Sequence, residues 1–276
     1  MSSEEAFDAA LDLLRRLDPT HIQKHLLNLI ELEPSLAEDL LSSTDTPLSV
    51  QRDPKSSQRE YLCCDYNRDI DSYRSPWSND YYPPLADADL VESPFPSGSL
   101  RKLEIIANDS FDIYRDLYYE GGISSVYLWD LEEESRDFAG VVLFKKSDQS
   151  SSNWDSIHVL EVIFENDVEA TYRVTTTIIL HLDKQQKITL SGNLTRQTEK
   201  TLSVPSDATE EQLNVAHITN LGTLIEDIES QMRNLLETVY FEKTRDIYHE
   251  VRSSITGSDK LNKANQEEVI KGLQNL

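Results

Sequence analysis

The chain has 276 residues, 38% of them hydrophobic, and a formal net charge of −24. Such acidity disfavours binding to nucleic acid and would repel an anionic membrane from the chain as a whole. Only two cysteines are present and they are adjacent, no apolar run approaches the ~20 residues of a membrane span, and the start MSSEEAFDAALDLL lacks a basic signal-peptide region. These features predict a reduced, intracellular, soluble protein.

Residues 1–45 are expected to form a helical stalk. Asp18-Pro19 interrupts the helical pattern, and Pro34 suits the first turn of a further helix. The segment therefore reads as three short antiparallel helices. Their apolar positions are Phe7, Leu11, Leu14, Leu17, Ile22, Leu26, Leu27, Ile30, Leu36, Leu40 and Leu41.

Residues 46–122 are rich in Ser, Asp and Pro, and most of the segment has little periodicity. We expect turns, extended segments and at most short strands there. The exception is a helix near 101–119, which Gly121-Gly122 ends. Its candidate inward positions are Leu103, Ile106, Phe111, Tyr114 and Leu117.

Residues 123–200 change to a strand pattern, with segments rich in β-branched and aromatic side chains and separated by short polar breaks. The short connections favour hairpins, so five antiparallel strands are expected between about 123 and 195. Along one strand, one face is expected to carry Val174, Thr176, Ile178, Leu180 and Leu182, and the other Arg173, Thr175, Thr177, Ile179 and His181.

A long helix is expected within residues 215–253, beginning near 217. Its apolar positions follow a seven-residue repeat, which fits either a coiled-coil strand or a helix laid over the sheet. Because the sheet needs a cover on at least one face, the second arrangement is more economical. The repeat consists of Ile218, Leu221, Ile225, Ile228, Met232, Leu235 and Val239.

Residues 254–276 form a tail with a short amphipathic segment. Val269, Ile270, Leu273 and Leu276 fall on one helical face, and Lys271 lies on the polar side. The segment is either a last helix packed on its own domain, a frayed end, or a binding element. Such a short helix is marginal in water, so we expect only weak binding from the tail alone and tight binding only with a second attachment.

No catalytic constellation is present: the sequence has no phosphate loop, G-x-S-x-G, H-E-x-x-H or C-x-x-C. His158 and His181 are interpreted as ordinary sheet residues, and Cys63 and Cys64 as small apolar residues. The aspartates at 65, 69 and 71 lack the glycine and glutamate of a calcium loop. The sequence predicts no enzyme, cofactor or metal site.

Arg233 lies next to Met232 but off the apolar stripe, so it is expected to be exposed. It either pairs with Glu229 four residues earlier or contributes to a binding surface.

Several irregular segments occur in a specific order. EYLCCDYNRDIDSYRSPWSNDYY at 60–82 fits neither the helical nor the strand period. It is followed by SPFPSGSLRKLEIIANDSFDIYRDLYYEGGISSVYLWD at 93–130, WDSIHV at 154–159, YRVTTTIILHLD at 172–183, SGNLTRQTEK at 191–200 and NLGTLIEDIESQMRNLLETVYFEKTRDI at 220–247. Over nearly its whole length the chain resembles the β subunits of the F-actin capping protein.

The resemblance implies an α+β fold with an N-terminal three-helix stalk, a central antiparallel sheet of about five strands, a long C-terminal helix across the sheet and a mobile amphipathic tail. It implies an obligate heterodimer with the capping protein α subunit, in which the two sheets join. The dimer is expected to lack enzymatic activity, to bind filament barbed ends without severing, and to be cytoplasmic, in cortical actin structures.

The resemblance also gives roles to individual residues. Arg233 matches a basic patch that contacts actin and binds acidic phosphoinositides in the family. The tail matches the family's actin-binding "tentacle", through Val269, Ile270, Lys271, Leu273 and Leu276. The alternative is a coiled-coil adaptor that uses the helix at 218–239 and is not specific for actin. That alternative leaves the five-strand region unexplained.

Overall fold

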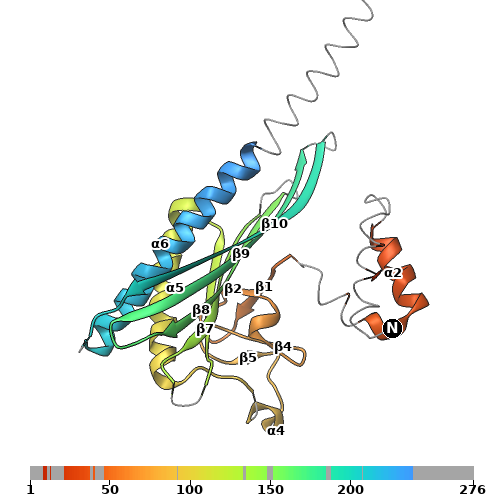
Figure 1. Ribbon diagram of the computed structural model, residues 1–276. Helices are drawn as coiled ribbons and strands as arrows, with labels where there is room; N and C mark the ends of the chain where they lie inside the picture. Colours follow the sequence, from red (N-terminus) through yellow and green to blue (C-terminus); the bar gives the residue numbers. More distant parts are fainter. Residues whose placement is uncertain are drawn as a thin grey trace, which may run out of the picture.

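The computed structural model describes residues 9–10, 13, 22–37, 40, 47–91, 93–132, 135–147, 152–184, 188–206 and 208–238. Its central feature is a five-stranded antiparallel sheet in the order β10-β9-β8-β7-β6 (Figure 1). The strands are β6 (Ile123–Asp130), β7 (Phe138–Ser147), β8 (Asn153–Phe164), β9 (Glu169–Lys184) and β10 (Ile188–Ser203). Each strand pairs with the next along the chain, which confirms the predicted five-strand sheet.

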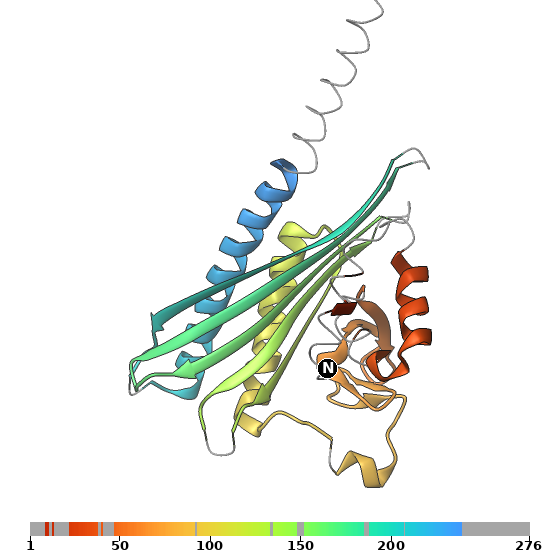
Figure 2. The same cartoon turned by 45° about the vertical axis from the view of Figure 1, so that its right-hand side comes forward.

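Two long helices, α5 (Gly98–Tyr118) and α6 (Glu210–Leu236), lie against the same face of this sheet (Figure 2). The main core fills the space between them and the strands. As expected, Val174, Thr176 and Ile178 of β9 point into buried surroundings, whereas the alternate residues are partly exposed. The backbone of Leu182 belongs to β9, but its side chain is not among those that the structure describes.

The seven-residue repeat of α6 serves to cover the sheet. Leu221, Ile225, Ile228 and Met232 are buried, packed in clusters with residues of the strands, so they are not available to a coiled-coil partner. The helix begins at Glu210, seven residues before the expected start. A capping box explains the earlier start, because Thr209 and Gln212 each accept a hydrogen bond from the other's backbone N–H. Val239 and the expected continuation to 253 lie outside the described residues.

The opposite face of the sheet is partly covered by the segment before α5. It contains β1 (Ser49–Asp53), β2 (Arg59–Cys63), β3 (Arg68–Asp69), β4 (Ser72–Arg74), β5 (Tyr81–Tyr82), a 3-10 turn (Asp65–Asn67) and α4 (Asp87–Leu90). A second apolar cluster joins Leu48 and Leu62 of this segment to Tyr127, Val141 and Leu143 of the sheet. Burial raises the pKa of the Cys63 thiol to about 12, so this residue is an inert apolar group, as predicted.

The N-terminal region is described only in part. It contains α2 (Ile22–Leu32) and a 3-10 helix (Pro34–Leu36) whose first turn holds Pro34. Leu36 and Leu40 are buried together with Ala10. Residues 1–8, 14–21 and 41–46 lie outside the described parts, so the three-helix stalk stays a prediction.

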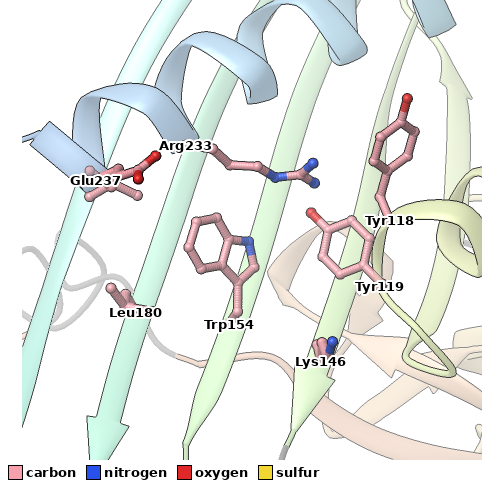
Figure 3. Close-up of a pocket in the computed structure, with 8 residues that line it drawn as sticks. Tyr118, Tyr119, Lys146, Trp154, Leu180, Arg233 and Glu237 are labelled. Carbon is pink, nitrogen blue, oxygen red and sulfur yellow. The ribbon is translucent and has the colours of Figure 1, made fainter. Parts of the chain in front are cut away.

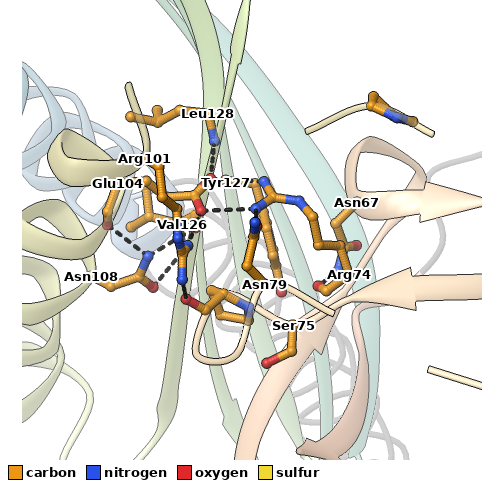
Figure 4. A network of polar contacts seen from close by, with 12 residues as sticks. Asn67, Arg74, Ser75, Asn79, Arg101, Glu104, Asn108, Val126, Tyr127 and Leu128 are labelled. Atoms are coloured by element: carbon orange, nitrogen blue, oxygen red, sulfur yellow. Dashed lines mark hydrogen bonds and ion pairs between the residues drawn. The ribbon is translucent and has the colours of Figure 1, made fainter. Parts of the chain in front are cut away.

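Side chains from α5 bind the free edge of β6 (Figure 4). Glu104 accepts a hydrogen bond from the backbone N–H of Leu128 at 2.7 Å. Asn108 bonds both backbone groups of Val126, each at 2.9 Å. This edge strand therefore has backbone groups satisfied by side chains where a further strand would otherwise pair.

Glu104 is also the centre of a buried ionic network. Its two carboxylate oxygens bind the guanidinium of Arg74 at 2.9 and 2.7 Å, and Arg101 forms a further ion pair with it. The side chains of Glu104 and Arg74 are 0% and 5% exposed. The network ties the irregular segment before α5 to both the helix and the sheet. By contrast Leu117, expected to point inward, is 70% exposed, because Tyr114 and Tyr119 pack against Phe144 instead.

None of the helices in the described ranges is long and apolar enough to cross a membrane.

Candidate functional site around Arg233

Arg233 lies near the end of the described part of α6, and its side chain is 32% exposed. Arg233 was expected to be exposed, and its side chain is instead partly buried. The guanidinium turns towards the end of α5, where its carbon lies 5.3 Å from the ring centre of Tyr118 and 5.5 Å from that of Tyr119. Contacts of a guanidinium with aromatic faces are favourable and cover part of its surface.

The charge partner of Arg233 is Glu229, at 2.5 Å, as the spacing of four residues predicts. The sequence does not reveal that this carboxylate is completely buried. It accepts hydrogen bonds from Tyr114 at 2.7 Å and Tyr119 at 2.5 Å, and it lies 3.0 Å from Nε2 of His158. Glu229 therefore joins α6 to α5 and to β8.

Opposing effects act on the ionisation of Glu229. Burial by itself raises the pKa of the carboxyl group, because it disfavours the charged form. The hydrogen bond and charge of His158, followed by the charge of Arg233 and the bond from Tyr119, outweigh burial and lower the pKa to about 2. The buried residue is therefore a carboxylate at neutral pH, and it fixes the position of the Arg233 guanidinium.

A pocket of about 510 Å³ adjoins this ion pair (Figure 3). Trp154, Leu180 and Leu236 contribute apolar surface from β8, β9 and α6. Arg233 and Tyr119 lie beside Trp154, and Lys146 reaches the pocket from β7. The arrangement suits an apolar group that carries a hydrogen-bond acceptor towards the arginine.

The cations at the pocket have acidic neighbours. Lys146 pairs with Glu120 at 2.9 Å, Arg233 pairs with Glu229, and Glu237 also lines the pocket. The site is thus apolar with local charges rather than a uniformly basic surface. Within the described ranges, no group of three His, Cys, Asp or Glu side chains is arranged to hold a metal ion.

Arg233 is the one predicted site residue that lies in the described part of the chain. Val269, Ile270, Lys271, Leu273 and Leu276 all lie outside it. Sequence reasoning missed Tyr119, His158 and Trp154, which surround Arg233 or its partner. Only the spacing of Glu229 and Arg233 is a local signal, and the other contacts depend on how α5 and the sheet meet α6.

Comparisons with known proteins give this arrangement a context. The structure resembles a solved structure described as the homodimeric actin capping protein alpha subunit from Plasmodium berghei, with a TM-score of 0.54. The likeness covers 91% of this chain and 96% of that chain at 18% identity, so it shows the fold alone. The chain therefore shares the fold of that actin capping protein subunit.

The family follows from sequence. Residues 7–248 match the family model for the F-actin capping protein, beta subunit. The F-actin-capping protein subunits beta of Saccharomyces cerevisiae and Candida glabrata are each 64% identical to the chain, with 99% of this chain and 100% of each relative covered. The subunit beta of Yarrowia lipolytica is 56% identical with the same coverage. The chain belongs to the F-actin capping protein beta subunit family, which is an actin-capping family rather than an enzyme class.

Proposed function

We propose that this chain is the β subunit of a heterodimer that binds the barbed ends of actin filaments and blocks gain and loss of subunits there. The observation that carries the proposal is the family match over residues 7–248. Seeded elongation assays on the dimer test it. Growth should stop at barbed ends and continue at pointed ends, without an increase in filament number. Unchanged barbed-end growth, or severing, would contradict it.

The outer edge of β10 supports the proposed heterodimer. Within the described sheet β10 pairs only with β9, whereas the edge of β6 is bound by side chains of α5. Thr195, Gln197 and Glu199 are among the exposed residues along it. An unpaired strand of this length favours pairing with another chain. We propose that the capping protein α subunit pairs here, so that the two sheets become continuous.

Expressed without the α subunit, the chain is expected to aggregate, because both the edge of β10 and the surfaces covered by a partner are exposed. Co-expression with the α subunit should give a soluble complex of one copy of each. Size-exclusion chromatography with light scattering measures both outcomes. A soluble monomer that unfolds cooperatively would contradict an obligate dimer.

Arg233 is proposed to contribute to filament binding as a fixed cation. Its guanidinium is held by Glu229 and by two tyrosine rings, so little side-chain freedom is lost when a partner contacts it. The chain as a whole is strongly acidic, so attraction to acidic actin has to come from local cations of this kind. Acidic phosphoinositides are proposed to compete for the same surface, in a cytoplasmic protein of cortical actin.

Arg233→Met is expected to slow association with barbed ends severalfold at low salt, since it removes the cation and keeps the length of the side chain. It should also cost about 1–3 kcal/mol of dimer stability, because Glu229 loses a partner inside the protein. Arg233→Lys should restore part of the association rate and part of the dimer stability. Timed elongation and thermal unfolding measure the two effects.

The matched control is Lys55→Met, which removes a cation from an exposed pair with Asp80, away from β10. An equal slowing of association by Lys55→Met would make the effect one of net charge and remove Arg233 from the site. Arg233→Glu would be less informative than Arg233→Met, because the buried Glu229 would face a second carboxylate and the dimer would lose stability.

A further inference from the structure

A small polar pocket of about 220 Å³ lies at the opposite end of α6 from Arg233. It is formed where the first turns of α5 and α6 meet the ends of β6, β7 and β8. Leu103, Phe138 and Phe164 give it apolar walls, and Asn214 and His217 of α6 line it as well. The volume is that of a single side chain or a small ring rather than a drug-sized ligand.

Asn214 has an unused amide in this pocket. The residue is 7% exposed, and no hydrogen bond joins its side chain to any residue in the described ranges. Arg115 Nε is the one fully buried side-chain nitrogen or oxygen without a partner among the described residues, so the amide of Asn214 is open to the pocket, where water or a ligand can bond it.

His217 presents a defined hydrogen-bond donor to the same pocket. Asn220 donates to the hydroxyl oxygen of Tyr172 at 3.2 Å, which leaves the Tyr172 proton for Nδ1 of His217 at 2.8 Å. Burial, and to a smaller extent the charge of Arg136, lower the pKa of His217 to about 4. The ring is therefore neutral at neutral pH and carries its proton on Nε2, which has no protein partner among the described residues.

Charges around the pocket exclude the simplest ionic ligands. Asp130, Asp137 and Glu210 line it together with one cation, Arg136. An anion would face three carboxylates, and a cation would meet an N–H donor from His217 at the buried end. A neutral ligand that both accepts and donates hydrogen bonds satisfies all of these groups.

We propose that this pocket binds a primary carboxamide, whose carbonyl oxygen accepts from Nε2–H of His217 and whose NH₂ group pairs with Asn214. The ligand is either a free small amide or the side chain of a glutamine or asparagine on a partner peptide. The aromatic and leucine walls pack against the carbon atoms next to the amide. The site is separate from Arg233, and it stands whether or not Arg233 contacts actin.

The test uses the dimer with the α subunit, carrying ¹⁵N-labelled histidine. Nicotinamide is titrated as the free amide, and a blocked Gly-Gln-Gly methylamide peptide as the side-chain source. The Nε2 resonance of His217, assigned by its loss in His217→Phe, should shift and saturate with at least one of them. Nicotinate and the matching Gly-Glu-Gly peptide should leave it unchanged. The probe that binds more tightly identifies the source.

Variants complete the test. Asn214→Leu should weaken binding of the better probe roughly three- to tenfold, as one lost neutral hydrogen bond implies. Asn234→Leu, the same change on an exposed turn of α6, should leave binding unchanged.

No saturable shift up to tens of millimolar of either probe means that water alone occupies the pocket, and the proposal is wrong. Equal binding of nicotinate, or unchanged binding in Asn214→Leu, also overturns it. If Asn214→Leu fails to assemble, the titrations of the parent dimer still decide.

Discussion

Replacing Glu104 by alanine is expected to destabilise the folded chain by about 3–5 kcal/mol, because it leaves Arg74 buried without its bidentate partner. The same change removes the acceptor for the backbone N–H of Leu128 at the edge of β6. Both the irregular segment before α5 and the edge of the sheet should loosen. Thermal unfolding of the dimer at fixed concentration, and hydrogen exchange at Leu128, measure these losses.

Two further variants separate the charge of Glu104 from its hydrogen bond to Leu128, and a buried ion pair from an exposed one. Glu104→Gln keeps an acceptor for Leu128 and removes the charge, so Leu128 should retain more protection from exchange than in the alanine variant. Glu60→Gln breaks an ion pair with Arg52 whose side chains are 65% and 40% exposed, and should cost less than about 1 kcal/mol. Similar losses for Glu104→Ala and Glu60→Gln would refute the special role of the buried network.

Deleting residues 261–276 is expected to speed dissociation from barbed ends on the order of 10²-fold, since one of two attachments is lost. The deletion should leave association nearly unchanged, because the cations that guide encounter are retained. The melting temperature of the dimer should stay close to that of the parent. Dilution-induced release of capped filaments measures the dissociation rate.

The contact that the tail makes is tested by a second variant of full length. Leu273→Asp with Leu276→Asp should reproduce much of the deletion, because it removes apolar contact from the proposed binding face. Lys263→Gln, a change at the polar side of the same segment, serves as the control. A large loss of thermal stability on truncation would make the tail a core helix, and an unchanged dissociation rate would remove it from the binding site.

The fold was predictable where local pattern and burial agree. The strand pattern from 123 onward predicted the five strands, and the apolar repeat of α6 matched the face that covers them. The start of α6 was misplaced because its first turn, at Glu210, is polar and outside the apolar stripe. The capping pair Thr209 and Gln212 was the signal that marks this start.

The candidate site was less predictable, since most of its contacts join distant parts of the chain. The pair of Glu229 and Arg233 is visible at helical spacing, but the burial of Glu229 is not. That burial arises from Tyr119 and His158, which are 110 and 71 residues away along the sequence. No periodicity in a single sequence brings such residues together.

The two borders of the sheet differ in what they permit. At β6 the side chains of Glu104 and Asn108 take the backbone groups that an incoming strand would need, whereas in the described part of the sheet the outer edge of β10 is not paired with a strand. Polymerisation by strand addition is therefore open at one border only. If a partner of the same fold has one sheet edge bound by side chains in the same way, pairing the open edges of the two chains leaves no unpaired edge. Strand addition therefore stops at two chains. The protein proposed to stop the growth of actin filaments would thus not form a polymer of its own.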